Sequence, residues 1–350
     1  MTLAALSLTG CQMGYIVNNG YEQFKLLGSS IPIEQILKDP NVDAATKEKL
    51  KLAMEAKQFA ETRLSLKQTK NYSSYVDLKR PYVTYIVSAS PKDELKYYTW
   101  HFPIVGSVPY KGYFEKKKAD KEAEGLKEEG YDTYVRGVSA YSTVGWFTDP
   151  VLSSMMRYSD YDLVNTIIHE TVHATLYISN NANFNERMAT YLGDLGTKLF
   201  YEEKRQNVDA VLKQVKLENE DQLQFSLFLS KNLKELEDWY KAHKKDADML
   251  TTREAQFQKI KDNFKKDLKP KLKTDKYDYF AELKFNNAQL LGYKLYMNDL
   301  SDFEKLTLIF KNDFQKIIKY CVSLKKSKDP EKDLKAFVNS SLNSKDSSHP

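Results

Sequence analysis

Residues 163–176 read LVNTIIHETVHATL, and the H-E-x-x-H pattern of His169, Glu170 and His173 lies at their centre. Two side chains four residues apart on a helix project from one face, so both imidazoles can bind the same tetrahedral ion. Glu170 cannot easily bind that ion, but it can reach the fourth, water-filled position and act as a general base. Bound zinc lowers the pKa of such a water to about 7. The segment therefore predicts a helix that holds one zinc ion and supports attack of water on a carbonyl.

The alternative is that two histidines and a glutamate fell into this spacing by chance. The chain has 5 histidines in 350 residues, so chance gives roughly 0.01 occurrences of the pattern, even with Asp counted as Glu. Apolar residues on both sides of the motif indicate a buried helix, in which a pair of imidazoles without a partner would be costly. A bound metal ion is therefore the favoured interpretation.

A third ligand must come from elsewhere in the chain, and Glu186 is the favoured candidate. It begins the next predicted helix, 186–203, in which residues 189, 190 and 193 are small and share its helical face. Catalytic zinc commonly takes two histidines and one carboxylate. The alternative is a first-turn carboxylate that interacts only with the helix dipole. His101 lies in a predicted strand and His243 lies in a run of lysines, so neither is favoured as a ligand.

The rest of the chain predicts an α+β fold, with a small mixed-sheet lobe followed by a predominantly helical lobe that carries the H-E-x-x-H helix. Runs of β-branched and aromatic residues predict strands, whereas apolar residues at helical spacing predict helices. The predicted strands are 82–88, 97–105 and 131–141. The predicted helical regions are 32–70, 115–129, 163–179, 186–203, most of 205–272, and 302–324.

These elements suggest a division of the chain into consecutive parts. The expected parts are a signal peptide at 1–11, an N-terminal helical and α+β lobe at 12–150, a helical catalytic lobe at 151–340 with long charged helices at about 205–275, and a flexible tail at 341–350.

The composition argues against several classes of protein. Hydrophobic residues make up 41% of the chain and charged residues 29%, and the net charge of +5 is small beside 53 basic and 48 acidic residues. Because the lysines are scattered rather than clustered, nucleic-acid binding is not expected. Two cysteines, Cys11 and Cys321, cannot build a cysteine-based metal cluster.

The N-terminus has a feature of its own. Residues 8–11 read LTGC after a short apolar run, and they resemble a bacterial lipobox, in which Cys11 would be lipidated. The lysine or arginine that normally precedes such a run is missing, so the alternatives are a start further upstream or an apolar N-terminus without this function. No other stretch approaches the ~20 apolar residues that span a bilayer. We therefore expect a periplasm-facing protein of the bacterial cell envelope, in contact with a membrane only through this anchor.

With these residues the chain resembles the gluzincin metallopeptidases and, more narrowly, a family of bacterial lipoprotein-type proteins described as aminopeptidases. The segments that carry the resemblance are 10–12, 100–106, 110–114, 137–150, the metal motif, 184–186 and 285–288. The resemblance implies a gluzincin-like fold, zinc and hydrolysis of peptide bonds. The chain differs from the thermolysin-like members at Thr190. Those members carry an aspartate at this position, and it supports a histidine that binds the metal. In this chain Asp194 or another group must support that histidine. The interval between His173 and Glu186 is also shorter than in those enzymes.

Candidate substrate-binding residues are less well defined. Ala140, Tyr141, Ser142 and Thr143 lie in a predicted rim strand, 138–144, which could pair with an extended peptide; the alternative is an ordinary core strand. A phenol or an amide near zinc could also stabilise an oxyanion. The candidates for that part are Asn286, Asn287 and Tyr296.

The leading hypothesis is a zinc aminopeptidase acting on peptides in the cell envelope. The alternatives are a zinc endopeptidase, a lipoprotein scaffold with a structural metal, and an enzyme inhibited by its own charged helices at 205–275. The residue that would hold the substrate amine, the side-chain preference and the oligomeric state are not predicted.

Overall fold

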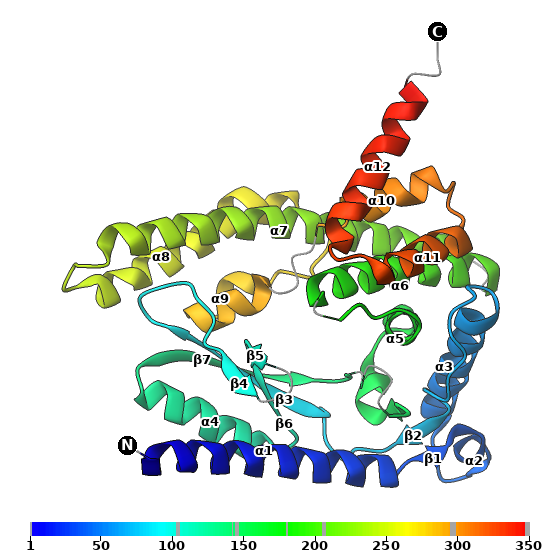
Figure 1. Cartoon of the computed structure of the whole chain (residues 1–350), viewed down its shortest axis with the longest axis horizontal. Helices are drawn as coiled ribbons and strands as arrows, with labels where there is room; N and C mark the ends of the chain where they lie inside the picture. Colours follow the sequence, from blue (N-terminus) through cyan, green and yellow to red (C-terminus); the bar gives the residue numbers. More distant parts are fainter. Residues whose placement is uncertain are drawn as a thin grey trace. The chain divides into compact units, whose positions relative to one another are not determined.

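The computed structural model describes residues 2–102, 106–141, 143, 147–179, 181–204, 208–294 and 299–346. The chain has the predicted α+β character, mostly helical with small sheets (Figure 1). It gathers into two compact units, and each unit combines three separate stretches of chain. Unit 1 contains Met1–Gln23, Tyr82–Ser139 and Asp209–Met297, and unit 2 contains Phe24–Pro81, Ala140–Val208 and Asn298–Pro350. Both units therefore include chain from either side of residue 150.

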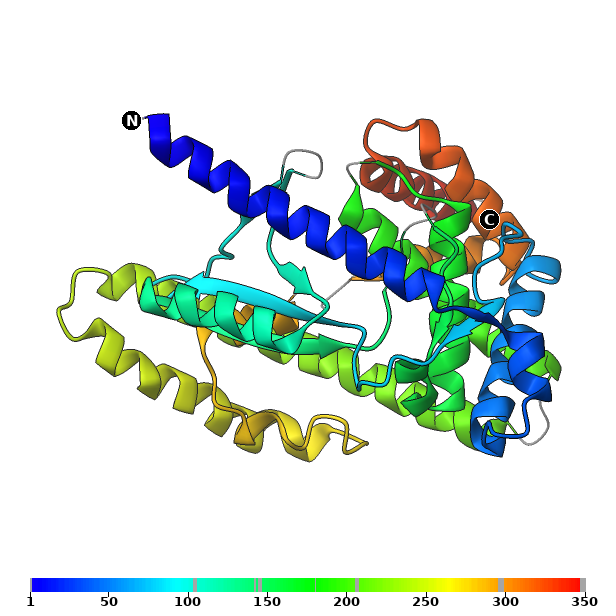
Figure 2. The ribbon, with the colours of Figure 1, turned by 90° about the horizontal axis from the view of Figure 1, so that it is seen from below.

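Unit 1 is built around a three-stranded antiparallel sheet. The strands of this unit are β3 Thr84–Pro91, β4 Trp100–Phe102, β5 Gly106–Val108, β6 Lys111–Tyr113 and β7 Tyr131–Val138. β3 is central, with β6 on one side and β7 on the other, while β4 and β5 form a separate pair. Helix α4 (Lys116–Glu128) lies along β3, as Figure 2 shows, and buries Ala119, Ala123 and Leu126 against the sheet. Small residues at two of these positions let the helix approach the strands closely.

The second layer of unit 1 is helical. The stretch expected to form long charged helices contains α7 (Asp209–His243) and α8 (Met249–Asn263). Helix α7 packs against α8 and against α9 (Asn287–Lys294). Their buried faces form an aromatic-rich core with Phe264 and Phe280, whereas their other faces are charged. This one-sided pattern stabilises long helices because the apolar stripe is covered and the charged stripe is hydrated.

A buried ion pair joins the sheet of unit 1 to its helices. Arg253 on α8 donates to both carboxylate oxygens of Asp132 on β7, at 2.9 and 3.1 Å. The backbone N–H of Asn287 donates to the same carboxylate, and its side chain bonds the carbonyls of Pro91 and Glu94. The partners named here all belong to unit 1.

Unit 2 is mainly helical. Its helices, after the end of α1, are α2 Ile33–Lys38, α3 Ala44–Thr62, α5 Asp160–Thr175, α6 Ala182–Lys204, α10 Ser301–Ile309, α11 Phe314–Ser323 and α12 Pro330–Asp346. A small sheet places β2 (Ser74–Val76) between β1 (Ile31–Pro32), which is antiparallel to it, and β8 (Val151–Leu152), which is parallel to it.

Helix α5 is specified locally at both ends. The hydroxyl of Ser159 accepts from the N–H of Asp162, which caps the N-terminus, and Asp160 adds a favourable charge in the first turn. The helix ends where Leu176 turns extended. Its buried positions recur at helical spacing and face α3 and α6; they are Leu163, Val164, Ile167, Ile168, Thr171 and Val172.

The two ends of the described chain concern the predicted lipid anchor at Cys11 and the predicted flexible tail at 341–350. Helix α1 spans Thr2–Gly28, and the side chain of Cys11 lies outside the described residues, so the lipid anchor remains a prediction. Among the helices described, none is long and apolar enough to cross a membrane. At the other end, α12 runs on to Asp346, into the segment expected to be a flexible tail.

The Asp132–Arg253 pair gives a test of this fold. Replacing Asp132 by alanine leaves a buried guanidinium without its carboxylate, which should lower the free energy of unfolding by about 3–5 kcal/mol. Urea unfolding measures the loss. The control is Glu235→Ala, which removes an exposed partner of Lys259 and should cost at most about 1 kcal/mol. An equal, small loss in both variants would contradict the structural role of the buried pair.

Candidate metal centre

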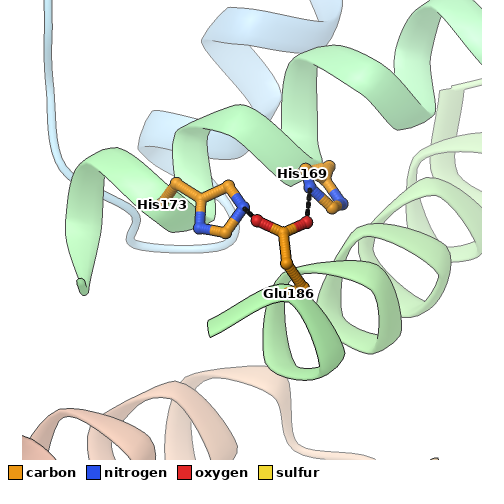
Figure 3. A group of neighbouring side chains, drawn as sticks. All are labelled: His169, His173 and Glu186. Carbon is orange, nitrogen blue, oxygen red and sulfur yellow. Dashed lines mark ion pairs between the residues drawn. The ribbon is translucent and has the colours of Figure 1, made fainter. Parts of the chain in front are cut away.

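Two neighbouring helices of unit 2 bring His169, His173 and Glu186 together. His169 and His173 lie one turn apart on α5, and Glu186 lies on α6. One carboxylate oxygen of Glu186 is 3.3 Å from Nε2 of His173 and the other is 3.8 Å from Nε2 of His169. Figure 3 shows the carboxylate between the two rings, whose centroids are 4.8 Å apart. The structure thus assembles the three predicted ligands in one cluster.

Glycines allow α6 to lie close to α5 at this point. A Cβ atom on Gly193 would come within 3.2 Å of the Cβ of His169, and one on Gly196 within 2.9 Å of a methyl group of Ile168. A larger side chain at either position would therefore crowd its neighbours. Gly193 is one of the small residues that share a helical face with Glu186, and the structure places it against His169.

Glu186 does not occupy the first turn of its helix. Helix α6 begins at Ala182, four residues earlier than the sequence suggested. The attraction of a carboxylate to the helix dipole falls off beyond the first turn. A dipole role, the alternative explanation for Glu186, is therefore weakened.

The next residue, Arg187, anchors this end of α6. Its buried guanidinium bonds the carbonyl of Asp299 at 2.6 Å, pairs with Asp302 at 3.5 Å and also pairs with Glu331. These partners precede or belong to α10 and α12. The C-terminal helices of unit 2 thus hold the turn that presents Glu186.

Burial sets the charge state of the cluster. Removal from water and the neighbouring His173 lower the pKa of His169 to about 4, although Glu186 opposes the shift. A hydrogen bond with His173 is the main cause of the lowered pKa of Glu186. At neutral pH, His169 is therefore a neutral imidazole and Glu186 a carboxylate, which are the forms that bind metal.

The donor set and spacing fit a divalent metal ion. One ligand atom from each residue can be chosen so that all three lie within 4.8 Å of one another. Tetrahedral zinc with bonds near 2.1 Å needs ligand atoms about 3.4 Å apart, close to the separations of 3.3 and 3.8 Å found here. The buried Nδ1 of His173 has no hydrogen-bond partner among the described residues.

A histidine that binds a metal usually has a hydrogen-bond partner for its second ring nitrogen. For His169 the backbone of α6 is the candidate partner. His169 is hydrogen-bonded to the backbone of Ala189 on α6. Asp194, the candidate for this part, accepts from Asn165 at 2.8 Å, one turn before His169 on α5. A backbone carbonyl is a common partner for the second nitrogen of a ligating histidine, because it fixes the ring and its tautomer.

Tyr72 is a neighbour of Glu170 that the sequence did not indicate. Its ring is buried, and the charges of Glu170 and Asp149 add to the effect of burial in raising the pKa of Tyr72 well above its ordinary value. Its φ of 58° is uncommon for a bulky residue, and its N–H donates to the carbonyl of Asp149 at 2.7 Å. With 24 tyrosines in the chain, no pattern singles this one out.

The prediction of a rim strand at 138–144 is wrong for the described residues of that segment beyond Val138. β7 ends at Val138, so Ala140, Tyr141 and Thr143 lie outside a strand, and Ser142 lies outside the described residues. Thr143 bonds Asp149 through its N–H and its hydroxyl, at 3.0 and 2.8 Å. Such local side-chain bonds compete with strand pairing. A substrate role for this segment remains a prediction.

The remaining candidates belong to unit 1. Asn286 donates to the carbonyl of Thr133, and Asn287 is buried with its carbonyl oxygen bonded to Tyr240. Both amides thus have structural partners, and their substrate role remains a prediction, while Tyr296 lies outside the described residues. His101 is on β4 and His243 stacks on Trp239, and neither belongs to the candidate metal-binding cluster in the described part of the chain.

The chain was compared with protein-family models, curated proteins and solved structures. The model of a family described as "Putative aminopeptidase" matches residues 14–336, a range that includes the three clustered residues and Glu170. Neither the curated proteins nor the solved structures contain a significant match.

The lowered pKa of His169 predicts that acid destabilises the metal-free protein. An unfolded imidazole binds a proton below about pH 6.5, whereas folded His169 binds one only near pH 4. Between these values the unfolded state holds more protons, so stability should fall as the pH decreases from 6.5 to 4, by about 2–3 kcal/mol. The lowered pKa of Glu186 acts in the same direction at the acid end. Urea unfolding at a series of pH values, with a chelator present, measures this slope.

Two variants isolate the contribution of His169. His169→Gln should flatten the slope, and His101→Gln, which changes an exposed histidine on β4, should leave it unchanged. A slope that is the same in all three proteins would rule out His169 as its source.

Proposed function

The chain belongs to the "Putative aminopeptidase" family, and from this membership and its metal-binding cluster we propose that it is a zinc-dependent peptidase. His169, His173 and Glu186 would hold the ion. The observation that carries the proposal is the position of all three ligand atoms within 4.8 Å of one another, one residue away from a glutamate that can act as a base. When bound, zinc would polarise the scissile carbonyl and acidify water.

Glu170 has the chemistry of a general base. It follows His169 directly on α5 and is partly buried, and its charge acts on Tyr72. In the proposed reaction Glu170 accepts a proton from the attacking water and then donates it to the nitrogen of the departing amine. Proton transfer by a positioned side chain contributes about 10²–10⁴-fold to a rate.

The openness of the cluster supports a catalytic rather than a structural site. The Glu186 side chain is 57% exposed, although those of His169 and His173 are only 19% and 5% exposed. Structural zinc is almost always held by four protein ligands, whereas catalytic zinc keeps a position for water or substrate. Only three candidate ligands gather at this point in the described ranges of the chain, which favours the enzyme over the scaffold.

Exopeptidase action is the finer part of the proposal. It follows from the family description alone, because an aminopeptidase needs a group that binds the free α-amine, and no residue here is assigned to that task. The substrate class we propose is peptides with a free N-terminus.

Two variants test the mechanism. Glu170→Gln should keep one zinc per chain and lose about 10²–10⁴-fold in kcat, while His169→Ala should lose the metal because one of its three ligands is gone. Metal analysis and a peptide-cleavage assay with chelation and zinc add-back measure both effects.

Glu304→Gln, an exposed carboxylate on α10, is the matched control and should change neither quantity. Full activity in Glu170→Gln would refute the proposed base, and full zinc binding in His169→Ala would refute the ligand set.

A second experiment separates the two kinds of peptidase. Matched peptides with a free and an acetylated N-terminus are compared as substrates of the zinc-loaded enzyme. We expect cleavage of the free peptide only, one residue at a time, as resolved by mass spectrometry. Equal cleavage of both peptides, or first cuts within the chain, would identify an endopeptidase.

A further inference from the structure

An exposed aromatic residue borders the metal-binding cluster. Tyr177 lies two residues after the end of α5 and is 40% exposed, whereas its neighbours Leu176 and Ile178 are buried. The centroid of its ring is 6.3 Å from that of the His173 ring. Extended backbone sends alternate side chains to opposite sides, so two neighbours face the core while Tyr177 faces solvent beside a proposed ligand.

The backbone that carries Tyr177 is fixed to the helix that carries Glu186. Asn185 is fully buried and makes two hydrogen bonds with Ile178: its Oδ1 accepts from the N–H at 2.9 Å and its Nδ2 donates to the carbonyl at 2.8 Å. On the N-terminal side of Tyr177, the N–H of Leu176 donates to the carbonyl of Val172, which belongs to α5. Tyr177 is thus held between the two elements that supply the ligands.

An aromatic ring held in this way is suited to recognise an apolar side chain. Rigid rings lose little conformational entropy on binding and offer a large contact area. A peptide whose scissile carbonyl lies at the cluster carries the side chains that flank that bond within a few ångströms of it. The exposed part of the ring then offers an apolar surface beside His173 that such a side chain can cover.

We propose that Tyr177 is a specificity-determining residue, which favours peptides with a large apolar side chain next to the scissile bond. This inference rests on the proposed peptidase function and deepens it. The ring makes the contact, and the phenol oxygen is not needed for it. Pocket contacts of this kind discriminate between substrates by about 10–200-fold.

Selectivity measurements test the proposal. Peptides that carry leucine or alanine in turn at the two residues flanking the cleaved bond are compared by kcat/KM. In Tyr177→Ala the preference for leucine should fall about tenfold or more, with little change for alanine and no loss of zinc. Tyr177→Phe should keep the wild-type preference, because the ring remains. Leu308→Ala, which truncates an exposed apolar residue of α10, is the control and should also keep it.

Binding gives a second measurement that does not depend on turnover. The leucine and alanine peptides are titrated calorimetrically into zinc-loaded Glu170→Gln, with and without Tyr177→Ala. The difference in Kd between the two peptides should shrink about tenfold when the ring is removed.

The outcomes separate this inference from the function on which it rests. An unchanged preference in Tyr177→Ala, or an equal loss for both peptides, would overturn the specificity role. An equal loss in Tyr177→Phe and Tyr177→Ala would overturn it too, since it would assign the effect to the phenol. If the wild-type protein cleaves none of the peptides, the proposed function fails, and the calorimetric preference alone then decides whether Tyr177 recognises the side chain.

Discussion

The close contact between α5 and α6 is the constraint on which the candidate site depends. Two imidazoles and one carboxylate converge where the two helices lie close together, and glycine at position 193 leaves room for this approach at His169. The same approach brings the backbone of Ala189 within hydrogen-bonding reach of that ring. It also excludes water, which keeps His169 neutral and available to a metal. Helix packing, ligand orientation and charge state thus have one common cause.

Part of this site could be predicted from the sequence, because it is encoded by short-range spacing. The four-residue interval of His169 and His173 and the small residues after Glu186 determine which faces meet. The structural role of Asn185 could not be predicted, because its two hydrogen bonds to the backbone of Ile178 depend on the path of the chain after α5. Tyr72 approaches Glu170 from more than ninety positions earlier in the chain, and no local pattern encodes such a contact.

The same distinction applies to the fold. Runs of β-branched and aromatic residues predicted β3 and β7, and helical spacing predicted most of the described helices. The strand was expected to continue beyond Val138, but Thr143 bonds the side chain of Asp149 instead. Such local hydrogen bonds compete with strand pairing. The assembly of each unit from three stretches was not predictable either. It follows from packing between residues that are remote in the chain, such as Asp132 with Arg253 and Asn287.

The anchoring of Arg187 has a consequence for the order in which the protein can mature. The arginine that holds the first turns of α6 has its partners at Asp299, Asp302 and Glu331. A ribosome makes these residues more than a hundred positions after the H-E-x-x-H helix. The nascent chain therefore carries both histidines long before it can hold Glu186 firmly in place. The metal binding that we propose would therefore be completed only after Glu331, the last of these partners, has been made.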